Sequence, residues 1–235
     1  MTLATVSEIW CYPVKSMRGE RVVSARVDAR GLRGDRLFAV CDAAGKLGSG
    51  KDTRRMRRMS GLLGFGATLG AEGDVPRVTT PEGSVHDVGD AALDARLSEA
   101  VGFAVSVQRE AKVSHFDAAP IHLVTRASLD WLRTASPGSV IDPRRFRPNL
   151  VLDAPGVGLL EDAWIGQTIV VGATRLRVTR RTERCVMTAM PQGDLPDDPA
   201  VLRAVARESA ACFGVYAEVE APGCIALGDA VSVDG

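Results

Sequence analysis

Short runs in which apolar and polar residues alternate dominate this chain and predict a mainly β protein with some helix. Successive side chains of a strand point to opposite faces, so a period of two marks a strand with one buried face. The run at residues 6–12 keeps this period and ends at Pro13. Further strands are expected at residues 21–27, 36–41, 77–80, 84–88, 150–152, 168–171, 175–179, 215–219 and 230–233. The turn sequences Asp42-Ala43-Ala44-Gly45 and Pro81-Glu82-Gly83 each predict a hairpin.

Helical spacing is confined to three segments. The expected helices start from Asp90, from about residue 125 and from Asp198, and the first two end before Gly102 and Ser136. Asp is favoured as a helix cap, and Gly commonly ends a helix.

Many short strands separated by Gly and Pro turns, with few helices, favour a β-barrel architecture. A polar region at residues 112–119 marks the natural break between two halves. We find no repeat, low-complexity tract or flexible linker, so the halves are expected to pack tightly.

Composition adds limits on function. The 235 residues, 46% hydrophobic and 25% charged, are ordinary for a globular protein. Lys+Arg and Asp+Glu both number 29, so no global field directs the chain to nucleic acid or an anionic membrane. The N-terminus lacks a signal-peptide pattern, and no segment approaches the roughly 20 apolar residues of a membrane span. We expect a cytoplasmic monomer that binds neither nucleic acid nor membrane.

The cysteines are few and scattered, with no CxxC pair, which argues against a disulfide scaffold or a structural zinc site. Cys185 stands out because Arg180, Arg181 and Arg184 precede it. Positive charge beside a thiol favours its thiolate form, which is a ligand for soft metals. Taken alone, the segment favours a simpler interpretation, a small buried side chain on a strand whose arginines face solvent. The remaining cysteines, Cys11, Cys41, Cys212 and Cys224, are expected to be core residues.

Other cations stand beside residues that shape the backbone. Lys15 and Ser16 follow Pro13, Arg36 follows a glycine turn, and Arg147 precedes Pro148 and Asn149. Arg clamps phosphate with two parallel hydrogen bonds, and Lys adds a point charge. Each of these cations is equally compatible with a solvated strand end.

The densest basic stretch is at residues 51–58. Its interleaved methionine suggests RNA binding, but two Tyr and three Trp in the whole chain offer few stacking platforms. We interpret the stretch as a basic rim on a loop or short helix and keep nucleic-acid binding as a weaker alternative. His86, His115 and His122 show no zinc-ligand spacing and are interpreted as structural; P-loop, GxGxxG and GxSxG motifs are absent.

Four segments occur in the order seen in the MOSC superfamily, and together they carry a resemblance that covers nearly the whole chain. They are Tyr12-Pro13-Val14-Lys15-Ser16, Gly31-Leu32-Arg33-Gly34-Asp35-Arg36, Phe146-Arg147-Pro148-Asn149 and Arg184-Cys185. The chain more closely resembles the mitochondrial amidoxime-reducing components and their bacterial relatives. The resemblance implies a MOSC N-terminal β-barrel domain at residues 1–112, packed against a β-barrel MOSC domain at residues 113–235.

The resemblance further implies a molybdenum–pyranopterin cofactor whose metal is bound by one cysteine, which falls on Cys185. The implied cofactor contacts are Lys15, Ser16, Arg36, Asp117, Arg147, Asn149, Glu183, Arg184 and Tyr216. Two departures stand out: Ala118 and Ala119 replace hydroxyl residues, and Glu183 replaces a small polar residue. Such changes around a metal alter cofactor affinity or redox potential.

The implied function is a molybdenum-dependent oxidoreductase that reduces N-hydroxylated or N-oxide compounds. Because the chain has no cysteine cluster and no flavin fingerprint, electrons are expected from a separate electron-transfer protein. Two alternatives stay open: a sulfur carrier with a persulfide on Cys185, and a cofactor-binding module without turnover.

Overall fold

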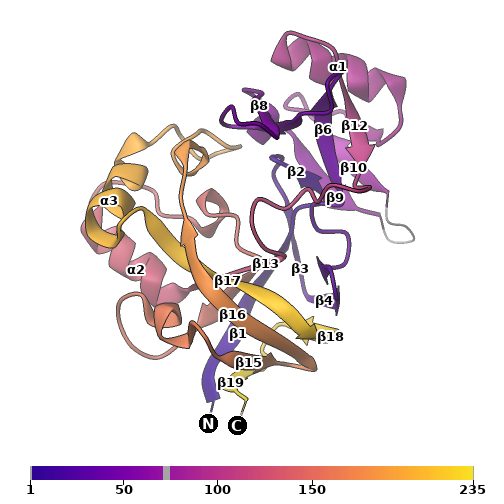
Figure 1. Ribbon diagram of the computed structural model, residues 1–235. Helices are drawn as coiled ribbons and strands as arrows, with labels where there is room; N and C mark the ends of the chain where they lie inside the picture. Colours follow the sequence, from indigo (N-terminus) through magenta and orange to yellow (C-terminus); the bar gives the residue numbers. More distant parts are fainter. Residues whose placement is uncertain (1, 71–74, 235) are drawn as a thin grey trace.

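The computed structural model describes residues 2–70 and 75–234, whose strands build two lobes (Figure 1). The larger lobe is a closed seven-stranded barrel. In order around the barrel its strands are β14 (Leu150–Asp153), β13 (Ile121–Thr125), β17 (Cys212–Ala221), β16 (Thr174–Glu183), β15 (Thr168–Val171), β19 (Ala230–Val233) and β1 (Thr2–Cys11). The pairing of β14 with β1 closes the sheet on itself, and only the β13–β14 pair among these is parallel. The structure confirms the predicted β-barrel.

Strand β1 comes from the beginning of the chain, whereas the other six barrel strands lie after residue 120. Its two barrel neighbours are β14 and β19. The barrel therefore includes a strand from the N-terminal half. The predicted domain boundary between residues 112 and 113 falls between β12 (Val105–Arg109) and β13, and it stays a prediction.

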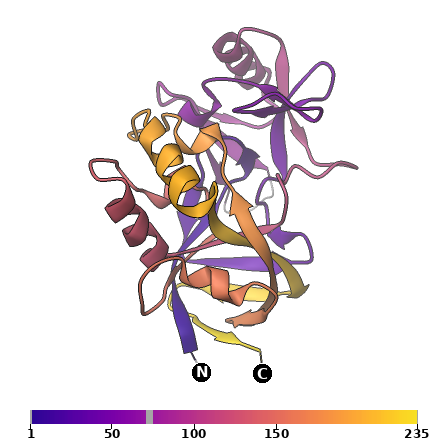
Figure 2. The same cartoon turned by 60° about the vertical axis from the view of Figure 1, so that its left-hand side comes forward.

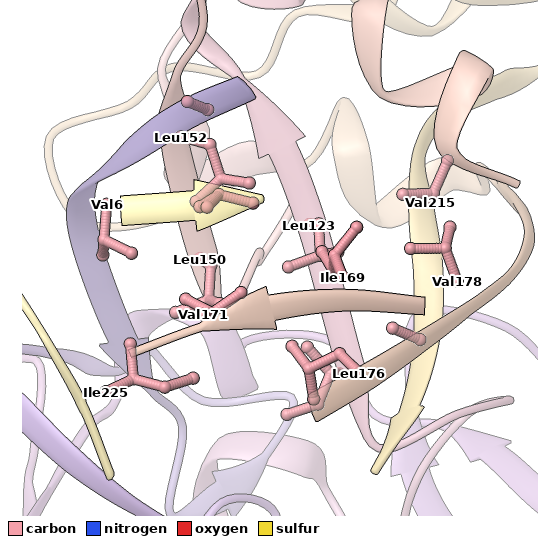
Figure 3. Packing of buried hydrophobic residues seen from close by; sticks show 14 of the residues in the cluster. Val6, Leu123, Leu150, Leu152, Ile169, Val171, Leu176, Val178, Val215 and Ile225 are labelled. Carbon is pink, nitrogen blue, oxygen red and sulfur yellow. The ribbon is translucent and has the colours of Figure 1, made fainter. Parts of the chain in front are cut away.

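Side-chain alternation fills the barrel. In β16, Thr174, Leu176 and Val178 are buried while Arg175 and Arg177 are exposed, because a strand of period two directs one set inward. Figure 3 shows Leu176 and Val178 converging with side chains from the facing strands, including Leu123, Leu150, Ile169 and Val215. Each fully buried aliphatic side chain contributes about 1.5–3 kcal/mol relative to an exposed one, so this core holds the barrel closed.

The smaller lobe contains two sheets and a helix. One sheet has the order β12, β6 (Phe38–Asp42), β7 (Leu47–Ser49) and β8 (Met56–Arg58), with β2 (Val14–Lys15) beside β6; the other is β11 (Val85–Asp87), β10 (Pro76–Thr79) and β9 (Gly66–Leu69). Both predicted hairpins are confirmed. In the first of them, the Asp42 carboxylate accepts hydrogen bonds from the backbone N–H groups of Ala44 and Lys46.

The single strand predicted at residues 21–27 is wrong. The chain forms β3 (Glu20–Val22), which pairs with β1, and β4 (Ser24–Asp28), which pairs with β5 (Gly31–Leu32) and β18 (Gly223–Ala226). Val23 lies at the bend between them and is 74% exposed. The alternation runs through the bend because the chain changes hydrogen-bonding partners there, and sequence periodicity does not report partners.

The three predicted helices are confirmed within the described residues: α1 (Ala91–Val101), α2 (Arg126–Ala135) and α3 (Pro199–Ser209). Asp90, Thr125 and Asp198 cap them by accepting a hydrogen bond from a backbone N–H of the first turn. Helix α1 covers the smaller lobe, whereas α2 and α3 pack together against the barrel (Figure 2). Short 3₁₀ turns are η1 (Leu62–Gly64), η2 (Pro143–Arg145), η3 (Leu160–Trp164) and η4 (Val186–Thr188). None of the helices in the described residues has the length and apolar character needed to cross a membrane.

Candidate functional site

A pocket of about 190 Å³ brings together most of the predicted site residues. Its lining includes Arg36, Asp117, Arg147, Asn149, Glu183, Arg184, Cys185 and Tyr216. These residues come from both lobes: Arg36 lies two residues before β6, while Cys185 follows β16. The two remaining predicted residues, Lys15 and Ser16, are buried outside the lining. We call this cavity the junction pocket.

Cys185 lies where β16 ends and the short turn η4 begins, and its side chain is partly exposed. The backbone fixes this position, since Arg184 N–H donates to Ala211 O at 2.8 Å and Thr188 N–H donates to Cys185 O at 3.0 Å. The thiol is therefore held on the pocket wall by the end of a strand.

The other cysteines divide into two groups. Cys11 and Cys41 are buried, as predicted. The prediction of a core position is wrong for Cys224, which is exposed on β18, and Cys212 is only partly buried. Strand β18 alternates, and its inward position is taken by Ile225.

The three arginines before Cys185 do not act together. Arg181 forms an ion pair with Asp162 at 3.1 Å, and Arg180 donates to Ala118 O at 3.4 Å. Only Arg184 lines the junction pocket. The expectation of three cations around the thiol is wrong, because Arg180 and Arg181 are held by partners outside the pocket lining.

Arg184 is bound by uncharged acceptors. Its guanidinium donates to Phe146 O at 2.9 Å, to Phe213 O at 2.9 Å and to a ring nitrogen of His122. Burial lowers the pKa of Arg184 to about 10. Its positive charge is therefore desolvated, and no carboxylate in the described residues forms an ion pair with it.

Arg36 and Arg147 both stack on a buried tyrosine. Their guanidinium carbons lie 4.7 Å and 4.3 Å from the centre of the Tyr12 ring. Arg36 is neutralised by Asp35 at 2.5 Å, and this carboxylate raises the pKa of Arg36 although burial opposes the shift. Arg147 donates through Nη1 to Met17 O at 2.7 Å.

Arg147 carries the strongest sign of a missing partner. Its Nη2 is buried and has no hydrogen-bond acceptor among the described residues, and the Tyr12 hydroxyl is in the same state. Burial and the charge of Arg36 lower the pKa of Arg147 to about 10. A buried donor without an acceptor costs about 1–3 kcal/mol, so the pocket is suited to an acceptor supplied by a ligand.

Backbone strain gathers at the same place. Within the described residues, five non-glycine residues have positive φ, and three of them are predicted site residues: Ser16 at 65°, Arg36 at 49° and Arg147 at 53°. Such conformations cost on the order of 1–3 kcal/mol each and cluster at functional sites. The fold therefore holds these three residues in conformations that lower its stability.

Lys15 and Ser16 are buried outside the pocket lining, where their side chains form hydrogen bonds with other residues. Lys15 Nζ donates to Asp117 Oδ1 at 2.6 Å and to His115 O at 2.8 Å. Burial lowers the pKa of Lys15, and the Asp117 carboxylate opposes that shift. Ser16 Oγ donates to Gly48 O at 2.9 Å. Direct ligand contacts by these two side chains stay a prediction.

Sequence reasoning missed His122 as a pocket residue. It lines the junction pocket, is 4% exposed and packs against Tyr216 with ring centres 5.7 Å apart. Burial and the charge of Arg184 hold the pKa of His122 well below its usual range, so the ring is neutral and accepts from Arg184.

Asn149 holds His122 in place, since its side-chain oxygen accepts from His122 N–H at 3.1 Å and its backbone N–H donates to His122 O at 2.8 Å.

The arrangement can hold an anionic group that carries a soft metal. Cys185 supplies one thiol, and Arg147 and Arg184 supply positive charge that no described carboxylate pairs with. Within the described residues, no cluster of three His, Cys, Asp or Glu side chains is placed to hold a metal ion. A metal at Cys185 would therefore take its other ligands from a cofactor or from water.

Comparison with known proteins places this geometry in a family. Residues 101–232 match the MOSC domain, and residues 3–119 match the MOSC N-terminal beta barrel domain. Mitochondrial amidoxime reducing component 2 of Bos taurus is 24% identical over 284 residues, covering 97% of this chain and 83% of the relative. Mitochondrial amidoxime-reducing component 1 is 24% identical in Homo sapiens, covering 99% of this chain and 84% of the relative, and 26% identical in Mus musculus, covering 99% and 83%.

Among solved structures, the YUAD protein from Bacillus subtilis aligns with a TM-score of 0.56 at 16% identity, covering 99% of this chain and 96% of that chain. At this identity the likeness supports the fold alone. The matched MOSC model covers more than half of the sequence, and this protein therefore belongs to the MOSC domain family.

Proposed function

We propose that this protein is a molybdenum cofactor-dependent oxidoreductase that reduces N-hydroxylated compounds. One observation carries the proposal: the thiol of Cys185 shares a pocket with Arg147 and Arg184, two buried guanidinium groups without carboxylate partners. A pocket with unneutralised positive charge favours an anion, and a thiolate favours a soft metal.

The residues present fit a molybdenum–pyranopterin group. Its phosphate is an acceptor for planar guanidinium donors, and Arg147 Nη2 is a buried donor that lacks an acceptor. Arg36, Arg147 and Arg184 would hold the anionic parts, and Cys185 would bind the metal. When bound, the group supplies two-electron redox chemistry that no amino-acid side chain provides.

The chain's own residues supply ligand, charge and access. Reduction of an amidoxime to an amidine breaks one N–O bond, consumes two electrons and two protons, and releases water. His122 is fixed as an acceptor for Arg184, so it is not the proton donor. Glu183 is an exposed carboxyl group on the pocket wall, and we assign it the exchange of protons with solvent.

We take the proposed substrate class from the names of the relatives. The bovine and human proteins are named as amidoxime-reducing components, and this chain aligns with them over nearly its full length. Met56, Phe116 and Met187 add apolar surface to the pocket lining, which suits an uncharged organic substituent on the N-hydroxylated carbon. Electrons are supplied by a separate protein.

Sulfur transfer is the second candidate, and the partial exposure of the Cys185 thiol in the pocket favours it. A carrier needs an accessible cysteine but no set of buried arginines. Mass spectrometry that finds a persulfide on Cys185 of metal-free protein would support this candidate. A cofactor-binding module without turnover is the third, because Ala119 and Glu183, two of the departures from the relatives, lie on the pocket wall.

The test is the reduction of benzamidoxime by cofactor-loaded protein with reduced methyl viologen as electron source. We expect benzamidine from the parent and from Cys212→Ser, a matched cysteine change outside the pocket lining, and none above background from Cys185→Ser. A loaded parent that leaves benzamidoxime unchanged would exclude this substrate class. Equal activity in both variants would exclude Cys185 as the metal ligand.

A further inference from the structure

A second hollow, on the smaller lobe, is lined by positively charged residues and by no negatively charged ones. Its lining includes Lys46, Arg54, Arg55, Arg109 and Lys112, all exposed, and no Asp or Glu. We call it the basic groove. Because the chain as a whole has no formal net charge, this concentration is local.

The charges in the basic groove are available to a partner. In the part of the chain that the structure describes, Lys46, Arg54, Arg109 and Lys112 form no ion pair. Arg55 is bound to backbone carbonyls, donating to Ser114 O at 2.5 Å and to Phe116 O at 3.4 Å. Unpaired exposed charges of one sign attract a partner of the opposite sign and speed its association.

The basic groove and the junction pocket share a thin wall. His115 lines the groove, while Phe116 and Asp117 line the pocket. Lys15 binds both ends of this segment, because its Nζ donates to His115 O at 2.8 Å and to Asp117 Oδ1 at 2.6 Å. A protein docked in the groove would lie one peptide segment away from the pocket.

The β7–β8 loop and the first residue of β8 contribute to both sites. Lys51 and Met56 line the junction pocket, whereas Arg54 and Arg55 line the groove.

One side chain that lines the basic groove, His115, has a ring nitrogen without a hydrogen-bond partner among the described residues. His115 is 4% exposed, and its Nδ1 is buried without a hydrogen bond among the described residues. Val113, beside it in the lining, is 59% exposed. An exposed apolar side chain among charged ones suits a protein interface, which combines apolar and polar contacts.

We propose that the basic groove docks an acidic electron-transfer protein, which delivers electrons through the shared wall to the junction pocket. The inference rests on the proposed function and gives it a partner surface. The carrier class is a flavodoxin or a small iron–sulfur ferredoxin, which loses two electrons in total for each N–O bond reduced, while the two protons come from solvent. Nucleic acid fits less well, because the groove lining has no Phe, Tyr or Trp on which bases could stack.

The test measures binding first, without turnover. An acidic flavodoxin and an acidic plant-type ferredoxin are titrated against cofactor-free protein by calorimetry at low and physiological ionic strength. The test variant is Lys46→Glu/Lys112→Glu, whose side chains make no hydrogen bond in the described residues. The matched control is Arg96→Glu/Arg203→Glu, two exposed arginines on α1 and α3 outside the groove.

We expect a carrier to bind the parent and the control equally, the test variant about tenfold more weakly, and added salt to weaken binding. In loaded protein, the test variant should lose carrier-driven reduction of benzamidoxime and keep viologen-driven reduction. If loaded protein fails to reduce benzamidoxime with viologen, the proposed function is refuted. The binding result would still show whether the basic groove docks a carrier.

Three results would overturn the docking proposal. One is that neither carrier binds. Another is that the test variant binds a carrier as tightly as the control does. The third is that a single-stranded oligonucleotide binds the groove more tightly than either carrier, which would identify a nucleic-acid surface.

Discussion

At the scale of single residues, the junction pocket is distinguished by positive charge that the protein itself does not neutralise. Arg36 and Lys15 each have a carboxylate partner, whereas Arg147 and Arg184 have only carbonyl, ring-nitrogen or no acceptors. Burying an unpaired charge costs free energy. A ligand anion would recover that cost, and this makes anion binding testable without the cofactor.

Phosphate should stabilise the cofactor-free protein in a pH-dependent way. Burial lowers the pKa of Arg147 and Arg184 to about 10, so both lose charge as the pH rises through that value, whereas an ordinary arginine stays charged. At ten times its dissociation constant, phosphate should add about 1.4 kcal/mol to the free energy of unfolding at pH 8. Differential scanning calorimetry should show this gain fall by about half or more at pH 10.5, where each of the two guanidinium groups is only about one quarter charged.

Arg147→Met should abolish the phosphate effect at every pH, and Arg203→Met, a matched change on the exposed face of α3, should preserve it. An undiminished effect at pH 10.5, or in Arg147→Met, would contradict the account of this pocket.

Sequence predicted the pocket residues unevenly, for a physical reason. Arg147 and Cys185 stand in motifs whose order along the chain was informative. His122 stands in no such motif, and it meets Arg184 only because β13 pairs with β17. Tyr12 stands in the first motif, but its contacts with two guanidinium groups form only after folding. Contacts between residues far apart in the chain depend on strand order, which periodicity does not contain.

At the scale of elements, caps and alternation were the reliable signals. The Asp90 and Asp198 caps were predicted, and β16 buries alternate residues as its sequence indicates. The bend at Val23 could not be predicted, because it arises where the chain leaves the β1 edge for β18. Local pattern therefore fixes the type of an element, and partners fix its ends.

A buried acid in η3, Glu161, contacts the start of helix α2 and should make stability depend on pH. Glu161 Oε2 accepts from Thr125 Oγ1 at 2.7 Å and from Ser128 Oγ at 2.6 Å, and burial raises the pKa of Glu161. Because the unfolded chain loses this proton first, near the ordinary value of about 4.3, the folded state loses stability as the pH rises above that value.

Urea unfolding of the parent and Glu161→Gln at several pH values measures this effect. The free energy of unfolding of the parent should fall relative to that of the variant between pH 4 and pH 7. A difference that stays constant over this range would show that Glu161 ionises normally.

At the scale of the whole molecule, the two lobes are in contact at Gly50, close to the candidate metal ligand Cys185. A Cβ on Gly50, in the β7–β8 loop, would lie 2.6 Å from Met187 Cγ and 3.0 Å from Met190 Sδ. Both methionines lie in or just after η4, which begins directly after Cys185. The smaller lobe therefore sets the position of η4 by direct packing.

Gly50→Ala should displace the methionines and with them η4, so that the loaded protein retains less cofactor. Because methionine side chains are flexible, the expected loss in the free energy of unfolding is small, about 1 kcal/mol. Gly66→Ala is the matched control, since its Cβ would meet its nearest atom at an ordinary 3.6 Å. Equal retention of the pterin, measured by fluorescence after oxidation, in both variants would show that the lobe contact does not position the site.

The central claim is that Cys185 and the arginines of the junction pocket hold a molybdenum–pterin group. The most direct measurement is molybdenum content by elemental mass spectrometry of protein from a host that makes the cofactor, with Cys185→Ser and Cys212→Ser purified in parallel. The account predicts near-equimolar molybdenum in the parent and in Cys212→Ser, and a sharp loss in Cys185→Ser. A parent without molybdenum or pterin, beside a loaded control enzyme from the same host, would contradict it.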